Sequence, residues 1–89
     1  MAHYHLSFKA RADVKSIYKY NARQKGLGFA DHYHGVLQNQ LQYIADNPFE
    51  YPEQSILRIG YRRCFVGEHA IWYKIISETE IDIIRINAR

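Results

Sequence analysis

The stretch RIGYRRCFVGEHAIWYK, residues 58–74, decides the fold. Extended, partly alternating runs lie on both sides of Gly67-Glu68, and glycine at the first central position suits a two-residue type II′ turn. The pattern therefore predicts a β-hairpin. That turn would fix three cross-strand pairs: Val66 with His69, Cys64 with Ile71, and Arg62 with Tyr73.

The two faces of this hairpin differ in character. One face carries residues expected to pack under helices, namely Cys64, Val66, Ile71, Tyr73 and Ile75. The other face carries aromatic residues between cations, namely Tyr61, Arg63, Phe65, Ala70, Trp72 and Lys74. Exposed clusters of aromatic residues and arginine mark interfaces, so we expect an open binding surface there, unless a loop or the C-terminus folds over it.

The N-terminal half predicts a short strand and two helices. HYHLS alternates polar and apolar residues, and Ser7 stands where a helix N-cap belongs. The first helix would end at Gly26 and Gly28. The second helix would have Asp31 in its first turn and end at Asn47-Pro48. Its apolar stripe consists of Phe29, Tyr33, Val36, Leu37, Leu41 and Ile44.

The element order predicted is β-α-α-β-β-β. After the loop NPFEYPEQ, the segments SILRI and YRRCFV read as extended, and HAIWYKII and IDIIRI read as strands. This order predicts an α+β fold in which a helical hairpin packs on one face of a mostly antiparallel sheet. A chain of 89 residues has room for one core, so residues 1–89 are expected to form a single domain.

Composition limits the partners and the compartment. The formal net charge of +3 and pI near 9.1 favour acidic partners. The single cysteine, Cys64, excludes an internal disulfide and is expected to be a small buried residue in a reducing compartment. There is no apolar run of about 20 residues and no signal-peptide layout, so we expect a cytoplasmic protein without membrane contact.

Metal ions and cofactors are not expected. His3 and His5 point to one side of a strand, but no four-ligand spacing accompanies them. GLG follows a helix and not a strand, which indicates a turn and not a phosphate-binding loop.

The chain resembles the ParE branch of the RelE/ParE toxins over nearly its whole length. The resemblance rests on the order and spacing of several pieces: the strand-serine-helix opening, Ala12-Asp13, Ala45 with Asn47-Pro48, Leu57-Arg58 with Gly60-Tyr61-Arg62, His69 with Ile71 and Tyr73, and Arg85-Ile86. It implies the toxin of a bacterial type II toxin–antitoxin pair that inhibits DNA gyrase and blocks replication. It also implies neutralisation in a hetero-oligomer with a ParD-like antitoxin.

Two surfaces follow from this resemblance and the open face. We expect the antitoxin to bind Tyr61, Arg63, Phe65, Trp72 and Lys74. We expect the target to bind at the end of the sheet beside the last strand, through Arg58, Arg85, Asn87 and Arg89. Sequence-specific contact with nucleic acid is not expected.

RelE-like relatives instead cleave messenger RNA on the ribosome, which is the main alternative. Four cations could hold phosphate, namely Arg62, Arg63, Lys74 and Arg85, and His69 or Glu68 could move a proton. However, Ala70 stands where those relatives place an arginine, and their basic tail has no counterpart. The resemblance therefore favours a non-enzymatic inhibitor without catalytic residues. A non-toxic antitoxin-binding module is the third reading.

The end of the sequence departs from the family pattern. ParE relatives continue past the last strand with a histidine, and Ala88 stands near that position. Because the C-terminal end matters for toxicity in that family, the resemblance bears more directly on membership than on activity against gyrase.

Overall fold

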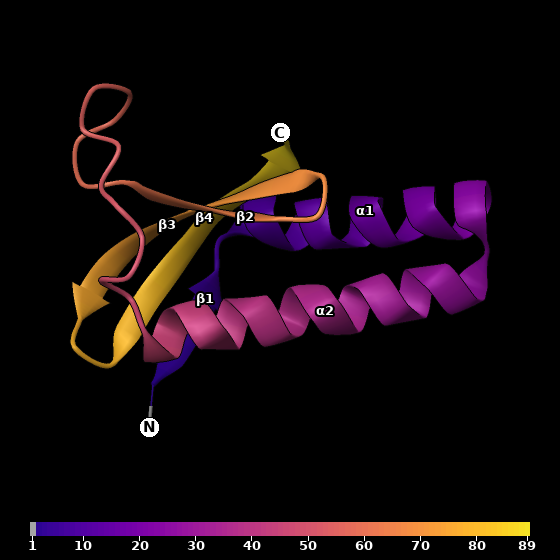
Figure 1. The fold of residues 1–89 in the computed structure, drawn as a ribbon, viewed down its shortest axis with the longest axis horizontal. Coiled ribbons are helices and arrows are strands. Elements are labelled where there is room, and N and C mark those ends of the chain that lie inside the picture. The colour runs from indigo at the N-terminus through magenta and orange to yellow at the C-terminus, as the bar shows by residue number, and fades with distance from the viewer. Residues whose placement is uncertain (1) are drawn as a thin grey trace.

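A computed structural model describes residues 2–89. Its elements follow the predicted order: β1 (His3–Leu6), α1 (Phe8–Lys25), α2 (Leu27–Asp46), β2 (Arg62–Val66), β3 (His69–Ser77) and β4 (Glu80–Ala88). The helices form an antiparallel pair on one side of the sheet, and their connected ends project beyond the strands (Figure 1). The predicted α+β class is confirmed.

The sheet has the strand order β1-β4-β3-β2. β2 with β3 and β3 with β4 are antiparallel, whereas β1 lies parallel to β4. A parallel pair needs a crossover connection, and the helical hairpin is part of the long connection that leaves β1 and returns to the sheet. The sheet is therefore mixed and mostly antiparallel, as predicted.

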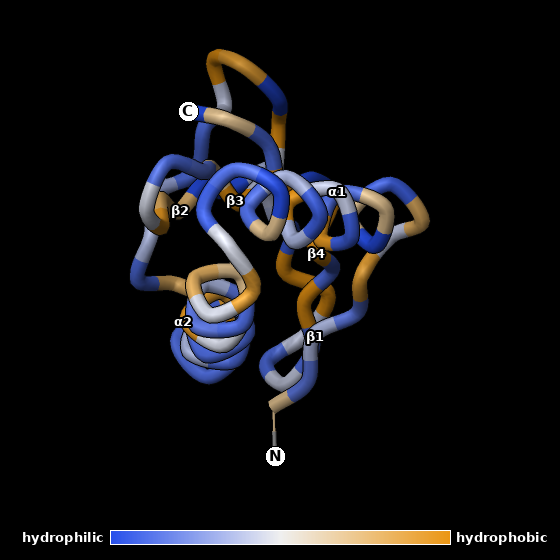
Figure 2. The backbone as a smooth tube through the Cα atoms, turned by 90° about the vertical axis from the view of Figure 1, so that its right-hand side faces the viewer, coloured by the Kyte–Doolittle hydropathy of each residue, from blue (hydrophilic) through white to orange (hydrophobic). Residues whose placement is uncertain are grey.

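The hairpin register is the one predicted. Val66 pairs with His69, Cys64 with Ile71 and Arg62 with Tyr73. The face that carries Cys64, Ile71 and Tyr73 packs under the helices. The core contains buried residues from α2, β3 and β4, among them Leu37, Leu41, Ile44, Ile71, Tyr73, Ile81, Ile83 and Ile86. In Figure 2 the orange, hydrophobic stretches of β4 lie inside the fold, while much of α2 is blue.

The helix ends agree with the sequence signals, except at the start of α2. Ser7 caps α1, because its hydroxyl oxygen accepts a hydrogen bond from the Ala10 N–H at 2.9 Å. Gly26 alone makes the turn, with φ of 95°, a conformation that favours glycine. Gly28 and Asp31 therefore fall inside α2, and placing Asp31 in the first turn was wrong. Its carboxylate instead accepts a hydrogen bond from the Tyr18 hydroxyl group.

The segment Ser55–Ile59 is not extended, contrary to the prediction. It forms consecutive turns, and Gly60 with φ of 82° precedes β2. The Leu57 and Arg58 N–H groups both donate to the Gln54 carbonyl oxygen, at 3.0 and 2.8 Å, which closes the loop on itself. The loop is the projection at the top of Figures 1 and 2, and its Ile56 side chain is fully exposed.

Candidate functional site

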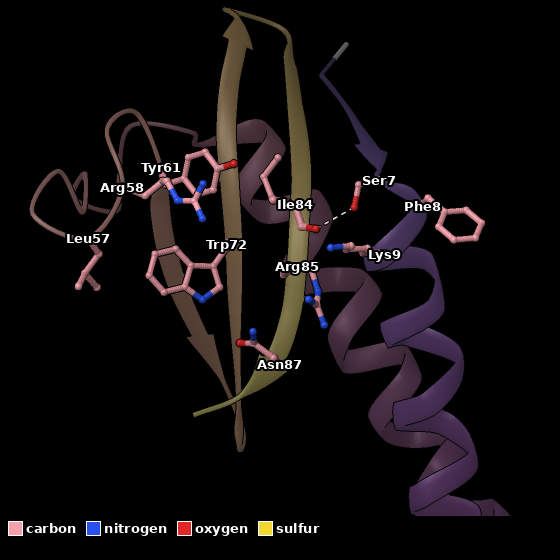
Figure 3. A pocket seen from close by; sticks show the side chains of 10 residues that line it. All are labelled: Ser7, Phe8, Lys9, Leu57, Arg58, Tyr61, Trp72, Ile84, Arg85 and Asn87. Carbon is pink, nitrogen blue, oxygen red and sulfur yellow. Dashed lines mark hydrogen bonds between the residues drawn. The ribbon is translucent and has the colours of Figure 1, made fainter.

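The sheet face opposite the helices contains a groove with a volume of about 710 Å³. The start of α1 forms one wall, the loop before β2 forms the other, and β3 and β4 form the floor (Figure 3). Ten residues line the groove: Ser7, Phe8, Lys9, Leu57, Arg58, Tyr61, Trp72, Ile84, Arg85 and Asn87. The set combines large apolar side chains with three cations and contains no carboxylate.

A local irregularity of β4 shapes the floor of the groove. Trp72 pairs with Arg85 and Tyr73 pairs with Ile83, so Ile84 is an extra residue in β4. Such a bulge bends the strand and re-aims neighbouring side chains. Here it brings both Ile84 and Arg85 to the groove.

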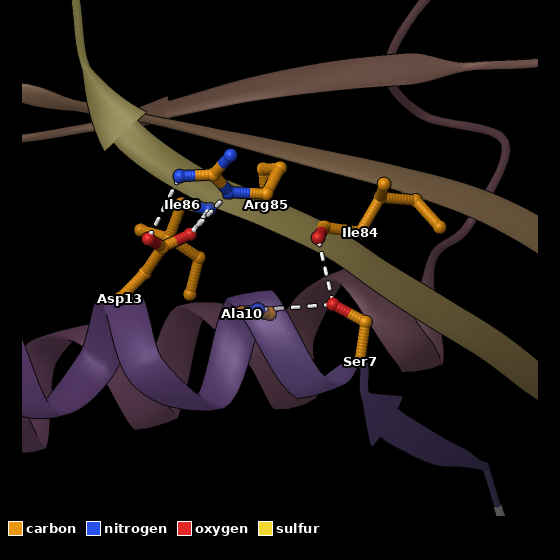
Figure 4. Close-up of polar contacts among 6 residues, drawn as sticks. All are labelled: Ser7, Ala10, Asp13, Ile84, Arg85 and Ile86. Carbon is orange, nitrogen blue, oxygen red and sulfur yellow. Dashed lines mark hydrogen bonds and ion pairs between the residues drawn. The ribbon is translucent and has the colours of Figure 1, made fainter.

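Side chains from the start of α1 complete the exposed edge of β4 (Figure 4). β1 pairs with β4 only as far as Leu6 with Ile83. Beyond that point, the Ser7 hydroxyl donates to the Ile84 carbonyl oxygen at 2.7 Å. The Ile86 N–H donates to Asp13 Oδ2 at 2.9 Å. Because unpaired strand groups are costly when buried, these two contacts replace a missing strand partner.

Asp13 also fixes the position of Arg85. The Arg85 Nε and Nη2 groups donate to the two carboxylate oxygens of Asp13 at 2.8 and 3.0 Å. Burial alone would raise the pKa of Asp13, but the hydrogen bonds from Arg85 and Ile86 and the charge of Arg85 outweigh it and lower that pKa. The carboxylate is therefore ionised near neutral pH, and Arg85 is held while its side chain stays 41% exposed.

Cations lie over the aromatic rings of the open face. The Arg63 guanidinium carbon lies 5.0 Å from the ring centres of both Phe65 and Trp72. Lys74 Nζ lies 5.6 Å from the Tyr61 ring centre, and the guanidinium carbon of Arg58 lies 5.3 Å from it. Cation–π contacts of this kind contribute about 0.5–1 kcal/mol each at exposed sites. They hold the cations in place before any partner arrives.

The structure brings the two predicted residue sets onto one continuous surface. Of the residues predicted to bind antitoxin, Tyr61 and Trp72 line the groove, and their cation partners lie beside them. Of the residues predicted to bind the target, Arg58, Arg85 and Asn87 line the same groove.

The remaining target residue, Arg89, lies outside the groove. Its guanidinium carbon is 4.2 Å from the Phe65 ring centre, and Nη1 donates to the Gly67 carbonyl oxygen at 3.2 Å. It therefore extends the aromatic and basic surface to the hairpin end. Within residues 2–89, Ala70 is the one buried member of the predicted open face.

Sequence reasoning missed part of the groove wall. No prediction placed Phe8 or Lys9 at a binding surface, and Leu57 belongs to a segment predicted to be extended. The N-cap position of Ser7 was the available signal, because it places the first helical residues at the edge of the sheet.

The two proton-transfer candidates, His69 and Glu68, are not among the residues that line the groove. His69 Nδ1 is 2.6 Å from the Tyr33 hydroxyl of α2, on the helix-covered side. Burial lowers the pKa of His69, against the opposing effect of the Glu68 charge. Arg62 likewise points toward the loop after α2, where it donates to the Tyr51 carbonyl oxygen at 2.6 Å. Neither His69 nor Arg62 lines the groove.

Neither a metal-binding cluster nor a membrane-spanning helix is found among residues 2–89. In that part of the chain, no cluster of three or more histidine, cysteine, aspartate or glutamate residues is arranged to hold a metal ion. None of its helices combines the length and apolar character needed to cross a bilayer.

A family model described as the ParE toxin of the type II toxin–antitoxin system parDE matches residues 4–89. The chain belongs to the ParE toxin family. It is 35% identical over 86 residues to toxin ParE1 of Caulobacter vibrioides, covering 97% of this chain and 88% of that one. It is 30% identical over 83 residues to toxin ParE1 of Mycobacterium tuberculosis, covering 93% and 85%. The predicted membership of the ParE branch is confirmed.

A solved structure supports the ParE fold. The chain matches the chromosomal ParDE TA system from P. aeruginosa with a TM-score of 0.83, covering 99% of this chain and 96% of that one. The sequence identity is 19%, so this likeness shows the architecture. The predicted β-α-α-β-β-β fold of the ParE family is thereby confirmed a second time.

Proposed function

We propose that this ParE-family toxin inhibits DNA gyrase and that a cognate antitoxin neutralises it by covering the open face of the sheet. The observation that carries the proposal is the groove, which is lined by cations and large apolar side chains and by no carboxylate. Interfaces concentrate aromatic residues and arginine in the same way. Both partners would meet the toxin in the cytoplasm, which fits the reduced, buried Cys64.

The same chemistry defines the antitoxin. An acidic segment with apolar anchors would complement Lys9, Arg58 and Arg85 through charge, and Trp72 and Ile84 through burial. Arg58 is already stacked on Tyr61, and Arg63 and Arg89 are stacked on Trp72 and Phe65, so these three cations lose less side-chain freedom on binding. The product would be a hetero-oligomer in which the groove is closed.

Inhibition by docking fits a groove whose lining contains cations and large apolar side chains but neither histidine nor carboxylate. A binding toxin needs a basic, partly apolar surface, and Arg58, Arg85 and Asn87 provide it beside the last strand. A ribonuclease needs a group that moves a proton next to the cations that hold phosphate. His69, one of the two candidates together with Glu68, is hydrogen-bonded to Tyr33 instead.

The test adds purified, antitoxin-free protein to a gyrase supercoiling reaction and, separately, to translating ribosomes. We expect loss of supercoiling or stabilised DNA cleavage, with messenger RNA intact. Arg58→Gln should weaken the inhibition at least tenfold, because interface arginines commonly contribute about 2 kcal/mol or more. Lys25→Gln is the control, since Lys25 lies at the far end of α1 and pairs with Phe29.

Other outcomes would reject the proposal. Cuts in the message at codon positions with gyrase unaffected would identify an mRNA interferase. Inactivity in both assays of a protein that can still bind its antitoxin in a separate titration would identify a binding module without toxicity.

A further inference from the structure

The exposed side of α1 carries a row of cations that the groove does not use. The helix holds six of the 12 lysines and arginines of the chain but only one of the nine acidic residues. Four of the cations follow one another at intervals of four residues: Arg11, Lys15, Lys19 and Arg23. Residues at i and i+4 lie on one ridge of a helix, so the row is continuous and spans about 18 Å.

No carboxylate neutralises this row within the described residues. All four cations are exposed, and none of them forms an ion pair there. Asp13, the acidic residue of α1, is held by Arg85 and Ile86. Like charges at i and i+4 repel and destabilise a helix. The row therefore opposes folding unless an anionic partner balances it.

The neighbouring ridge of α1 indicates which kind of anion the row of cations binds. Beside the cations lie Ser16, Tyr20 and Gln24, all exposed and all hydrogen-bond donors. Serine, tyrosine and glutamine side chains join arginine and lysine in contacts with phosphate oxygens. An acidic polypeptide would need large apolar anchors to bind tightly, and between Ala12 and Gln24 this ridge offers none except the Tyr20 ring.

We infer that the exposed face of α1 binds the phosphate backbone of duplex DNA, irrespective of sequence. The four cations lie on a helix that is packed against the core, so their row is rigid, and it suits the rigid phosphate backbone of a duplex. Binding of single-stranded nucleic acid instead uses several aromatic side chains on which the bases stack. The row crosses the face of α1 opposite the buried Ala10 and Asn21, so a duplex can approach it without disturbing the core. This inference does not depend on gyrase being the target.

The experiment measures fluorescence polarisation of a labelled duplex oligonucleotide of arbitrary sequence with the full-length, antitoxin-free chain. Four phosphate contacts predict a slope of about −3.6 when the logarithm of the association constant is plotted against the logarithm of the salt concentration. Binding should then be roughly 150-fold weaker for a fourfold rise in salt concentration. Lys15→Gln and Lys19→Gln should each reduce the magnitude of that slope by roughly 0.9. The quadruple variant with glutamine at the four positions should lose the salt dependence.

The matched control replaces four cations of the open face by glutamine, namely Arg58, Arg63, Lys74 and Arg89. It should leave the slope unchanged, and circular dichroism should confirm that both quadruple variants are folded. If either is unfolded, the single variants at Lys15 and Lys19 decide the question.

Three results would overturn the inference. The first is loss of DNA binding in the control variant but not in the α1 variants. The second is tighter binding of RNA of equal length, and the third is equal competition by polyglutamate at the same charge concentration. Because no gyrase is present, these results are independent of the supercoiling assay.

Discussion

Asp13 and Arg85 lie 72 positions apart in the sequence, yet a two-pronged ion pair joins them across the edge of β4. The same carboxylate binds the Ile86 N–H. One side chain of α1 thus holds the groove arginine and also satisfies the strand backbone, so its removal should affect stability and binding together.

Asp13→Asn should lower the free energy of unfolding by about 1–3 kcal/mol near neutral pH, since hydrogen bonds to charged groups contribute more than neutral ones. The Asp13 pKa is lowered from 3.8 in the folded state. Its contribution is therefore present above pH 3.8 and is lost as pH falls below that value through the folded pKa. Urea titrations of both proteins across this range measure it.

Asp31→Asn is the control for Asp13, because Asp31 is exposed and its one side-chain hydrogen bond within residues 2–89 is with Tyr18. An Asp13 variant as stable as the parent protein near neutral pH would contradict the role given to the ion pair. A difference that persisted unchanged in strong acid would show that the effect is not electrostatic.

Leu41→Ala should cost about 2–5 kcal/mol of unfolding free energy, the usual penalty for emptying a leucine site in a core. Leu41 is 2% exposed and belongs to the same cluster as Ile71 and Tyr73. Val36→Ala, at a position 37% exposed, should cost much less. Chemical denaturation tests both, and a Leu41 effect below about 0.5 kcal/mol would be incompatible with the packing described.

Trp72→Ala should weaken the complex with the antitoxin at least tenfold while leaving the fold intact. Trp72 lines the groove, and the Arg63 guanidinium stacks on it. Aromatic anchors at interface centres commonly contribute about 2 kcal/mol or more to binding. Isothermal titration calorimetry measures the affinity, with Tyr20→Ala on α1 as an exposed aromatic control. Equal affinities would remove the open face from the interface.

Two glycine substitutions should act in opposite directions. At Gly67, φ is +52°, and an added Cβ would lie 2.7 Å from the Tyr33 hydroxyl oxygen, so alanine should destabilise by about 1–3 kcal/mol. At Gly35 in α2, an added Cβ meets nothing within 4 Å, so alanine should stabilise by about 0.4–1 kcal/mol. Thermal unfolding midpoints distinguish the two, and a stabilising Gly67→Ala would show that the turn tolerates a side chain.

Local signals account for the parts of the fold that the sequence predicted. The Gly67-Glu68 turn fixed the hairpin register, because a two-residue loop allows one pairing only. Ser7 and Asn47-Pro48 marked helix ends through capping and steric effects. The prediction for residues 55–59 was wrong. Their alternation resembles that of a strand, but no neighbouring strand pairs with them.

The groove depended on relationships that no local pattern contains. The bulge at Ile84 lies where the pairing with β1 ends and the Ser7 hydroxyl donates to the Ile84 carbonyl oxygen. Lys9 and Leu57 line opposite walls of one groove because β4 returns beside β1 and the start of α1. The sequence analysis therefore singled out Arg58, Tyr61, Trp72, Arg85 and Asn87, which line the groove, but not Phe8 and Lys9 on its α1 wall.

The parallel pairing of β1 with β4 has a consequence for synthesis. The strand His3–Leu6 can pair only after residues 80–83 have been synthesised. Contacts between residues so far apart in the sequence slow folding. A nascent chain that has reached only Ser77 lacks Ile81, Ile83 and Ile86 of the core. Circular dichroism of a chain ended at Ser77 should show no cooperative unfolding transition. A growing polypeptide therefore becomes a folded toxin only when its last strand has left the ribosome, so translation itself delays the onset of toxicity.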